Sequence, residues 1–452
     1  MNKFYLFKIV VFILLVFIFF LKGVIFLDPD LGWHLRYGQL ILSSGLPQSD
    51  PFSYTMPSYI YANHEWLQDI ILSTWQSWGG LELPSLIFAI LTTSTIFLSI
   101  PKITVTWQFA TIFLSAAIFL SFAGIRPQTV SWLFFVIVLK IIKSQRFFLL
   151  LPLIFLVWAN LHGGFIIGLI SLFIYVLSKT ISERKILTKE VSVLILSILV
   201  TLINPYQFKL WQEIWKSATD PALRTVIEEW FPLLFAPQPL TIIWSLIFIY
   251  FFIKYKSGLS LFEKILYPIL FLAAVSSGRN MPFFILATMP FSITFSQKYR
   301  KILIILFYLF LATFLLSVAQ IFSPAKIDSV NYPAAAISFL KKQQIEGEIF
   351  APYSWGGYLI WQYPQKKVFI DGRMPSWRQD FIKGESEYAL GEYLDVLKNK
   401  YQLEEVFNKY KIGLVLWSIS SREKYTEEFT KNLPRSGWKK IYEDEVAVIY
   451  ER

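Results

Sequence analysis

The chain contains no cysteine, only three histidines and few charged residues, which make up 16% of the sequence. The absence of cysteine excludes disulfide bonds, thiolate metal sites and cysteine nucleophiles. No G-x-G-x-x-G or Walker pattern occurs either, so the sequence offers no recognisable nucleotide-phosphate loop. With 55% hydrophobic residues and a mean hydropathy of +0.52, the chain is too apolar for a soluble protein of 452 residues.

Long apolar blocks dominate the first 323 residues. They approach the roughly 17 to 25 residues that an α-helix needs to cross about 30 Å of hydrocarbon. We therefore expect a polytopic α-helical membrane protein with about eleven crossings, at residues 4–27, 83–101, 103–124, 127–143, 146–161, 163–179, 190–204, 238–253, 262–278, 281–297 and 302–322.

The net charge of +11 is unevenly distributed along the chain. Residues 1–323 hold 23 basic and 13 acidic side chains, whereas residues 324–452 hold 19 basic and 18 acidic ones. An odd number of crossings places the termini on opposite sides, and 16 of those 23 basic residues then fall on the N-terminal side. Because short cytoplasmic loops are rich in Lys and Arg, we expect a cytoplasmic N-terminus, an extracytoplasmic C-terminal region and a location in the cytoplasmic (inner) membrane. The basic excess therefore requires no nucleic acid partner.

With this orientation, most polar residues of the apolar part fall on the outer side. Ionisable residues near a bilayer are rare and mark functional sites by default. An envelope scaffold without chemistry at this face would show the same distribution by chance, so that alternative stays open. The outer-side residues are Asp28, Asp30, His34, His64, Glu65, Asp69, Arg126, His162, Asn204 and Arg279.

The first outer loop, residues 28–80, has the densest polar motifs. Asp30 is expected to cap an amphipathic interfacial helix that continues to about Gly45, and a second such helix should begin at Glu65. Asp30 and His34 are four residues apart and would share a helix face. There the carboxylate could orient or charge the imidazole, or both could contribute to a metal site, and capping alone is the simpler interpretation of Asp30.

Beyond Ser323 the composition becomes charged and mixed. We expect strands near 348–352, 367–371, 412–417, 438–442 and 445–450, with helices between them, which indicates a small soluble α/β domain over residues 324–452. The preceding 1–323 would form the transmembrane domain, with outer loops at 28–80 and 205–237. The motifs Trp355-Gly-Gly-Tyr358 and Asp371-Gly-Arg373 have no assigned role and are compatible with tight turns and a structural ion pair.

The acidic pair after the first span, the interfacial helix and the polar motif opening a second one resemble the organisation of GT-C fold glycosyltransferases that use polyprenyl-phosphate sugars. Aminoarabinose transferases, lipopolysaccharide-core transferases and protein O-mannosyltransferases are the better-known relatives. The chain is still more similar to an uncharacterised group of bacterial glycosyltransferase-like membrane proteins. This resemblance rests on Asp28-Pro-Asp30, His64-Glu65-Trp66, Arg126-Pro-Gln128, Asn160-Leu-His162-Gly-Gly164, Asn204-Pro205 and Arg279-Asn280.

The resemblance implies a membrane glycosyltransferase that moves a hexosyl or pentosyl group to an envelope lipid, glycan or protein at the outer face. Asp30, or else Asp28, would occupy the position of the carboxylate that deprotonates the acceptor hydroxyl. The phosphate leaving group needs cations, for which Arg126, Arg279 and Arg224 are candidates. Snorkelling or structural ion pairing is an equally good interpretation of these arginines.

His64 and Glu65 stand where aminoarabinose transferases carry a Lys-Pro-Pro element. They could assist acid/base chemistry, or bind a divalent cation such as Mg²⁺ or Mn²⁺ together with Asp28 and Asp30, as the oligosaccharyltransferase branch of the fold does. His34, His162 and Asn204 are further outer-face candidates. For His162, which precedes two glycines, a packing or capping role is as good an interpretation as a catalytic one.

Two other classes of function stay open. A lipid-glycan ligase or polymerase of another fold would use a large late outer loop and leave Asp28 and Asp30 dispensable. A transporter would show broken spans and charged groups near the bilayer midplane, and the sequence has few of these features. A non-enzymatic envelope scaffold would need neither broken spans nor midplane charges.

Overall fold

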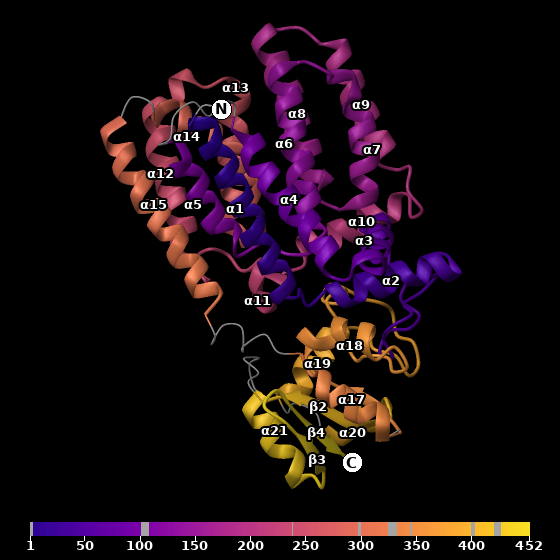
Figure 1. Cartoon of the computed structure of the whole chain (residues 1–452). Coiled ribbons are helices and arrows are strands. Elements are labelled where there is room, and N and C mark those ends of the chain that lie inside the picture. The colour runs from indigo at the N-terminus through magenta and orange to yellow at the C-terminus, as the bar shows by residue number, and fades with distance from the viewer. Residues whose placement is uncertain are drawn as a thin grey trace. The chain divides into compact units, whose positions relative to one another are not determined.

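The computed structural model describes residues 3–100, 108–236, 238–296, 300–323, 332–343, 346–398, 403–419 and 426–452 (Figure 1). The chain divides into two compact units. The helical unit comprises Met1–Phe26, Asn63–Gln68 and Trp78–Ser323, and the α/β unit comprises Leu27–Ala62, Asp69–Ser77 and Pro324–Arg452. This division differs from the linear boundary expected at residue 323, because most of the first outer loop groups with the C-terminal residues.

The helical unit is built from helices that overlap each of the eleven apolar blocks. Four of the described helices are long and apolar enough to cross a membrane: Phe4–Ile25, Glu82–Ser99, Phe165–Glu183 and Pro239–Gly258. Apart from α15, the other helices are shorter, and part of the block at 103–124 lies outside the described residues. The helices are α1 (Lys3–Ile25), α4 (Glu82–Ser99), α5 (Phe109–Phe119), α6 (Gln128–Ser144), α7 (Leu151–Leu161), α8 (Phe165–Glu183), α9 (Thr188–Val200), α10 (Phe208–Thr219), α11 (Leu223–Val226), α12 (Pro239–Tyr255), α13 (Leu261–Ser276), α14 (Met281–Ser296) and α15 (Arg300–Ile321).

Except for the amphipathic α10 and the short α11, these helices are composed mainly of apolar residues. Large aromatic side chains fill the space between them, including the fully buried Trp132 of α6 and Trp158 of α7. Helix α4 contacts α1 and α6, and α6 in turn contacts α8 (Figure 1). Apolar side chains such as Ile13 and Phe17 nevertheless cover the exposed face of α1. A helix that is apolar all round and still exposed requires an apolar surrounding.

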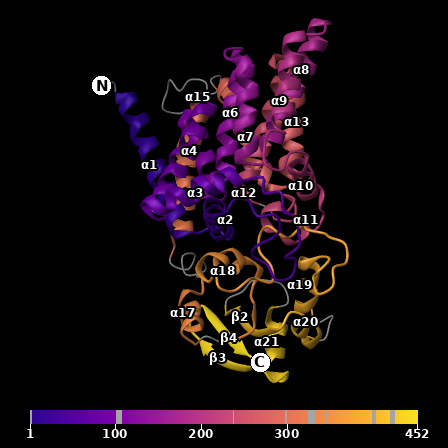
Figure 2. The same ribbon diagram turned by 90° about the vertical axis from the view of Figure 1, so that its right-hand side faces the viewer.

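The α/β unit contains a four-stranded sheet in the order β1-β2-β4-β3 (Figure 2). Strand β1 (Glu348–Phe350) pairs in parallel with β2 (Ile412–Ser418), while β4 (Ala447–Glu451) is antiparallel to β2 and to β3 (Lys439–Glu443). The strand expected at 367–371 forms only isolated bridges through Val368. The unit's helices are α2 (Leu31–Ser44), the middle of α3 (Trp66–Gly79), α17 (Ala334–Gln343), α18 (Gly356–Gln362), α19 (Ala389–Leu397), α20 (Leu403–Lys409) and α21 (Thr426–Arg435).

A buried arginine joins the first loop to the C-terminal residues within the α/β unit. The guanidinium of Arg373 forms a two-pronged ion pair with Asp371, through Nε at 2.8 Å and Nη2 at 2.6 Å, and its Nη1 lies 2.8 Å from Oδ1 of Asp50. Burial would lower the pKa of Arg373, but the charges of Asp371 and Asp50 outweigh burial and raise it. Trp377 and Trp33 lie against the guanidinium, 5.2 and 5.9 Å from their ring centres.

We expect Arg373→Gln to unfold the α/β unit readily, because it leaves two buried carboxylates without their counter-ion. Removing one partner of a buried ion pair costs about 3 kcal/mol or more. Arg452→Gln is the matched control, since its ion pair with Glu404 is exposed and is worth less than about 1 kcal/mol. The urea midpoint of tryptophan fluorescence would measure both, and equal midpoints for the two variants would contradict this account.

Candidate functional site

The acidic segment Asp28-Pro29-Asp30 opens helix α2 in the α/β unit. Asp30 occupies the N-cap position, but its side chain makes none of the capping hydrogen bonds expected from the sequence. Instead Oδ1 of Asp30 accepts a hydrogen bond of 3.1 Å from the indole Nε1 of Trp33, and the backbone N–H of Asp30 donates to Asp28. The carboxylate of Asp30 is therefore held in a fixed position by Trp33.

Glycines of the C-terminal motifs approach this acidic segment closely. A Cβ atom added to Gly372 would lie 1.7 Å from Oδ1 of Asp30, and one added to Gly357 would lie 2.2 Å from the carbonyl oxygen of Pro29. Only a glycine allows backbone to come so near. The motifs Trp355-Gly-Gly-Tyr358 and Asp371-Gly-Arg373, to which the sequence assigned no role, thus enclose the candidate base Asp30.

His34 does not take Asp30 as its partner, although the four-residue spacing had favoured that pair. Its Nδ1 lies 2.6 Å from Oδ1 of Asp69, a residue of α3, and both side chains are buried. The imidazole also lies against the indole of Trp33, with ring centres 3.6 Å apart. Asp69 was named among the outer-side residues, but a partner 35 positions away cannot be identified from helical spacing.

A second carboxylate–histidine pair lies in the helical unit. Oε1 of Glu65 is 3.2 Å from Nε2 of His162 and 3.9 Å from Nε2 of His64, and both Glu65 and His162 are buried. The sequence motifs His64-Glu65-Trp66 and Asn160-Leu-His162 are therefore brought together, as expected if they serve one site.

The surrounding hydrogen bonds fix the tautomer of His162. The hydroxyl of Ser131 accepts the indole N–H of Trp158 at 2.7 Å and lies 2.8 Å from Nδ1 of His162, to which it can donate its own proton. The backbone N–H of Gly164 also points at Nδ1, at 2.8 Å. Nδ1 is thus an acceptor, and the imidazole proton sits on Nε2, where it faces Glu65.

Two glycines after His162 make this arrangement sterically feasible. A Cβ at Gly164 would lie 2.5 Å from the Ser131 hydroxyl, and one at Gly163 would lie 2.8 Å from Cδ2 of His64. The Gly-Gly sequence therefore lets Ser131 and His64 approach from either side. A Cβ at Gly163 would also lie 3.2 Å from the side chain of Ile214, so this glycine makes room for an apolar neighbour as well.

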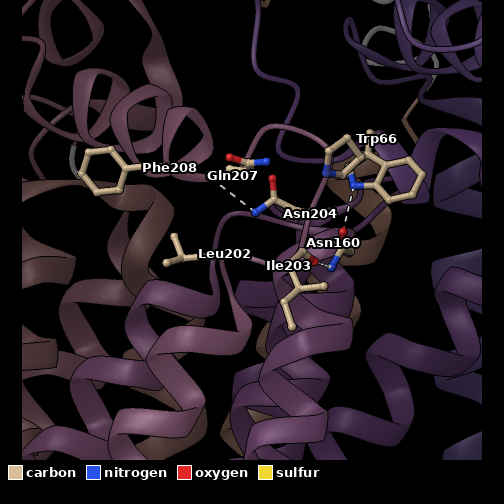
Figure 3. Close-up of a pocket in the computed structure, with 8 residues that line it drawn as sticks. Trp66, Asn160, Leu202, Ile203, Asn204, Gln207 and Phe208 are labelled. Carbon is tan, nitrogen blue, oxygen red and sulfur yellow. Dashed lines mark hydrogen bonds between the residues drawn. The ribbon is translucent and has the colours of Figure 1, made fainter.

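A pocket of about 660 Å³ adjoins this cluster through Trp66 and Asn160. The indole Nε1 of Trp66 donates to Oδ1 of Asn160 at 3.1 Å. Figure 3 shows the rings of Trp66 and Phe208 on opposite sides of the amides of Asn204 and Gln207. The described residues that line the pocket are all uncharged: Trp66, Asn160, Leu202, Ile203, Asn204, Pro205, Gln207 and Phe208.

Asn204 shapes the wall of this pocket. Its Nδ2 donates to the carbonyl of Thr201 at 2.8 Å, and its Oδ1 accepts from the backbone N–H of Tyr206 at 2.8 Å. The turn places Gln207 at φ +51°, a conformation that side-chain-bearing residues rarely adopt. Such strain clusters at functional sites and is maintained by the surrounding structure.

Arg126 and Arg279, two of the three arginines proposed to bind phosphate, converge on one short segment, η3 (Glu228–Trp230). Arg126 forms an ion pair with Glu229, and the guanidinium of Arg279 lies over the ring of Trp230 at 5.1 Å. Burial raises the pKa of Glu229, but the charges of Arg126 and Arg279 outweigh it and lower that pKa. Arg224 is exposed and bonds to the carbonyl of Ala218 at 3.3 Å instead.

Both groups of the helical unit are built at the start of α6. Arg126 immediately precedes this helix, and its carbonyl accepts a first-turn hydrogen bond from Thr129. Ser131, which orients His162, lies five residues further, roughly 7 Å along the helix axis. The described residues contain no cluster of three histidine, aspartate or glutamate side chains suited to a metal ion. The group Asp28, Asp30, His64 and Glu65 therefore gives no metal site from which a step can be derived.

The residues that sequence reasoning missed share one property. Ser131 and Trp158 are ordinary residue types for a helix interior, Gly372 was named only within a motif without a role, and Glu229 lay in the outer loop 205–237. Each acquires its role from a partner distant in sequence. Glu229 carried a weak signal, because an acidic pair in a largely aromatic loop is costly to leave without a cation.

We expect ¹⁵N NMR of the histidine-labelled protein to show His162 as the Nε2–H tautomer with an unprotonated Nδ1. Assignment follows from the loss of one signal in His162→Gln, with His34→Gln as the control. Ser131→Ala should shift the Nδ1 resonance and leave that of His34 unchanged. A protonated Nδ1 at His162 in the unsubstituted protein would contradict the hydrogen-bond assignment.

Comparison of the chain with protein-family models and with curated proteins gives no match. The case for a function therefore rests on the residues of this chain and their geometry.

Proposed function

We propose that the chain is a membrane glycosyltransferase of the GT-C type, which transfers a sugar from a polyprenyl-phosphate donor to an envelope lipid, glycan or protein. The observation that carries this proposal is the convergence of Arg126 and Arg279 on Glu229 at the same end of α6 that positions the Glu65–His162 pair. A cationic site and a buried carboxylate are the two groups that transfer from a phosphate leaving group requires.

In the proposed reaction the acceptor oxygen attacks C1 of the sugar. The bond from C1 to the phosphate oxygen breaks, its electron pair leaves with the phosphate, and the acceptor proton passes to a carboxylate. Arg126 and Arg279 would neutralise the charge that develops on the phosphate, since guanidinium groups match its oxygens. The uncharged pocket beside Trp66 suits a sugar ring, which aromatic faces and amides recognise.

Two carboxylates compete for the role of base. The resemblance gives it to Asp30, and the enclosure of Asp30 by Trp33 and Gly372 supports a positioned group. Glu65 is supported by its burial and by Nε2 of His162, which lies 3.2 Å from its carboxylate. No step of this mechanism requires a metal ion.

The proposed membrane arrangement has about eleven crossings, a cytoplasmic N-terminus and an extracytoplasmic C-terminal region in the inner membrane. It is supported by the four long apolar helices, by the helices that overlap the other apolar blocks and by the charge bias of the loops. Among the shorter helices, α6, α13 and α14, with 17, 16 and 16 residues, approach the lower limit of a span.

We expect Asp30→Asn or Glu65→Gln to lower transfer about 100-fold or more, according to which residue is the base, because removal of a general base typically costs that factor. Radiolabelled polyprenyl-phosphate sugars and a membrane extract as the acceptor source would serve for the assay. Arg126→Gln and Arg279→Gln should also abolish transfer. Glu228→Gln and Lys209→Gln are exposed controls that should retain it. Undiminished transfer in all four test variants, or sugar uptake into vesicles without transfer, would overturn the proposal.

Fusions of alkaline phosphatase should be active when attached after Arg452 and inactive when attached at the loop near Arg184. This pattern follows from an extracytoplasmic C-terminus and from the basic character of the loop between α8 and α9. Fluorescent protein fusions at the same positions give the complementary readout. The opposite pattern would invert the proposed topology and place the candidate site in the cytoplasm.

A further inference from the structure

The segment that carries Glu229 is attached to the segment that carries Arg279. The backbone N–H of Leu233 donates to the carbonyl of Val275 at 2.9 Å, and the N–H of Gly278 donates to that of Phe231 at 3.1 Å. These two bonds hold η3 beside η5 (Gly278–Asn280). Backbone hydrogen bonds of the protein itself therefore keep the segments of Glu229 and Arg279 together.

Glu229 is partly accessible to solvent. Its side chain is 37% exposed and that of its partner Arg126 is 20% exposed, so an anion from outside can reach the pair. The pKa of Glu229 lies below its ordinary range, since burial raises it less than Arg126 and Arg279 lower it. Lys22 acts on Glu229 in the same direction, but more weakly than either arginine.

The charge of the site differs from what a phosphate-binding pair of arginines would present alone. Arg126 and Arg279 supply two positive charges, and Glu229 removes one of them. A polyprenyl-phosphate sugar is a phosphodiester with one negative charge. The polyprenyl phosphate released by transfer is a monoester with about 1.5 to 2 negative charges near pH 7. Coulomb energy scales with the ligand charge, so one negative charge on the protein repels the product about twice as strongly as the donor.

We propose that Glu229 sets the phosphate selectivity of this site: it lets the sugar phosphodiester bind in preference to the phosphomonoester product and so promotes product release. The inference rests on the proposed function, because it assigns a second role within the same phosphate site. The proposed role predicts a difference in affinity between the phosphodiester and the phosphomonoester. A carboxylate that only holds Arg126 in place would not produce this difference.

The test uses the full chain in phosphatidylcholine nanodiscs, whose lipid carries no net charge. The probes are undecaprenyl phosphate and its methyl ester, which share one lipid tail and differ by one ionisable oxygen. Binding of both is measured at pH 8 to the unsubstituted protein, to Glu229→Gln, to the control Glu228→Gln and to the Arg126→Gln/Arg279→Gln double variant. Glu228 is the adjacent exposed carboxylate and has the same nominal charge.

We expect Glu229→Gln to tighten binding of the methyl ester about threefold and of the monoester about tenfold. Doubling the ligand charge doubles the Coulomb energy, so the factor by which the affinity changes is roughly squared. Glu228→Gln should change both by less than about twofold, since exposed charges are screened. Lowering the pH to 5.5 makes the monoester a monoanion, and its extra gain in Glu229→Gln should then vanish. Because the same two proteins are compared at both pH values, unequal folding would affect both comparisons alike.

The outcomes separate the inference from the proposed function. An equal gain for both esters, or weaker binding of both, in Glu229→Gln would overturn the selectivity role, while loss of binding in the double arginine variant would keep the phosphate site. If the double variant binds both esters as tightly as the unsubstituted protein, the phosphate site itself is wrong, and the selectivity role falls with it.

Discussion

The ion pairs of Arg373 are the interaction on which the α/β unit depends. This guanidinium is enclosed by Asp371 from its own turn and Asp50 from a segment more than 300 residues earlier. Neither carboxylate could be buried without it, since an unpaired charge in a dry interior is among the costliest features of a fold. The pairing brings the first loop and the C-terminal residues into one unit, and Gly372 next to Arg373 consequently meets Asp30. The position of the candidate base Asp30 thus depends on the buried ion pairs of Arg373, which take no part in the proposed reaction.

In the helical unit, hydrogen bonds between side chains take the place of the buried ion pairs of Arg373. Some buried polar side chains there form a short chain of donors and acceptors, such as Trp158, Ser131 and His162 in that order, and Oε1 of Glu65 lies 3.2 Å from the far nitrogen of this imidazole. A chain of this kind has a direction, because the indole at one end can only donate and the carboxylate at the other can only accept. Arg126, just before α6, and Arg279, in η5, likewise both act on the carboxylate of Glu229. Function is proposed where these chains end, at the carboxylates of Glu65 and Glu229.

The sequence was sufficient for features that depend on local composition. The positions of the helices followed from apolar blocks, and Leu31–Ser44 formed the helix that its amphipathic pattern predicted. The sequence also singled out His64-Glu65 and His162, which proved to be neighbours. It could not pair His34 with Asp69, because that contact joins two helices at a distance no periodicity encodes. Nor could it assign the glycines of the C-terminal motifs. They are needed because another segment packs closely against them, and glycine also occurs in turns for several other reasons.

The interleaving of the two units also bears on how the protein is made. The chain passes from one unit to the other after Phe26, Ala62, Gln68, Ser77 and Ser323. Asp50 leaves the ribosome early, whereas Arg373 is added only after every helix of the helical unit has been synthesised. The carboxylates of the first loop therefore stay in water until the C-terminal residues that enclose them have been synthesised. An incomplete chain has no means of burying Asp50 and cannot assemble the surroundings of Asp30, so premature termination yields helices without the candidate base in place.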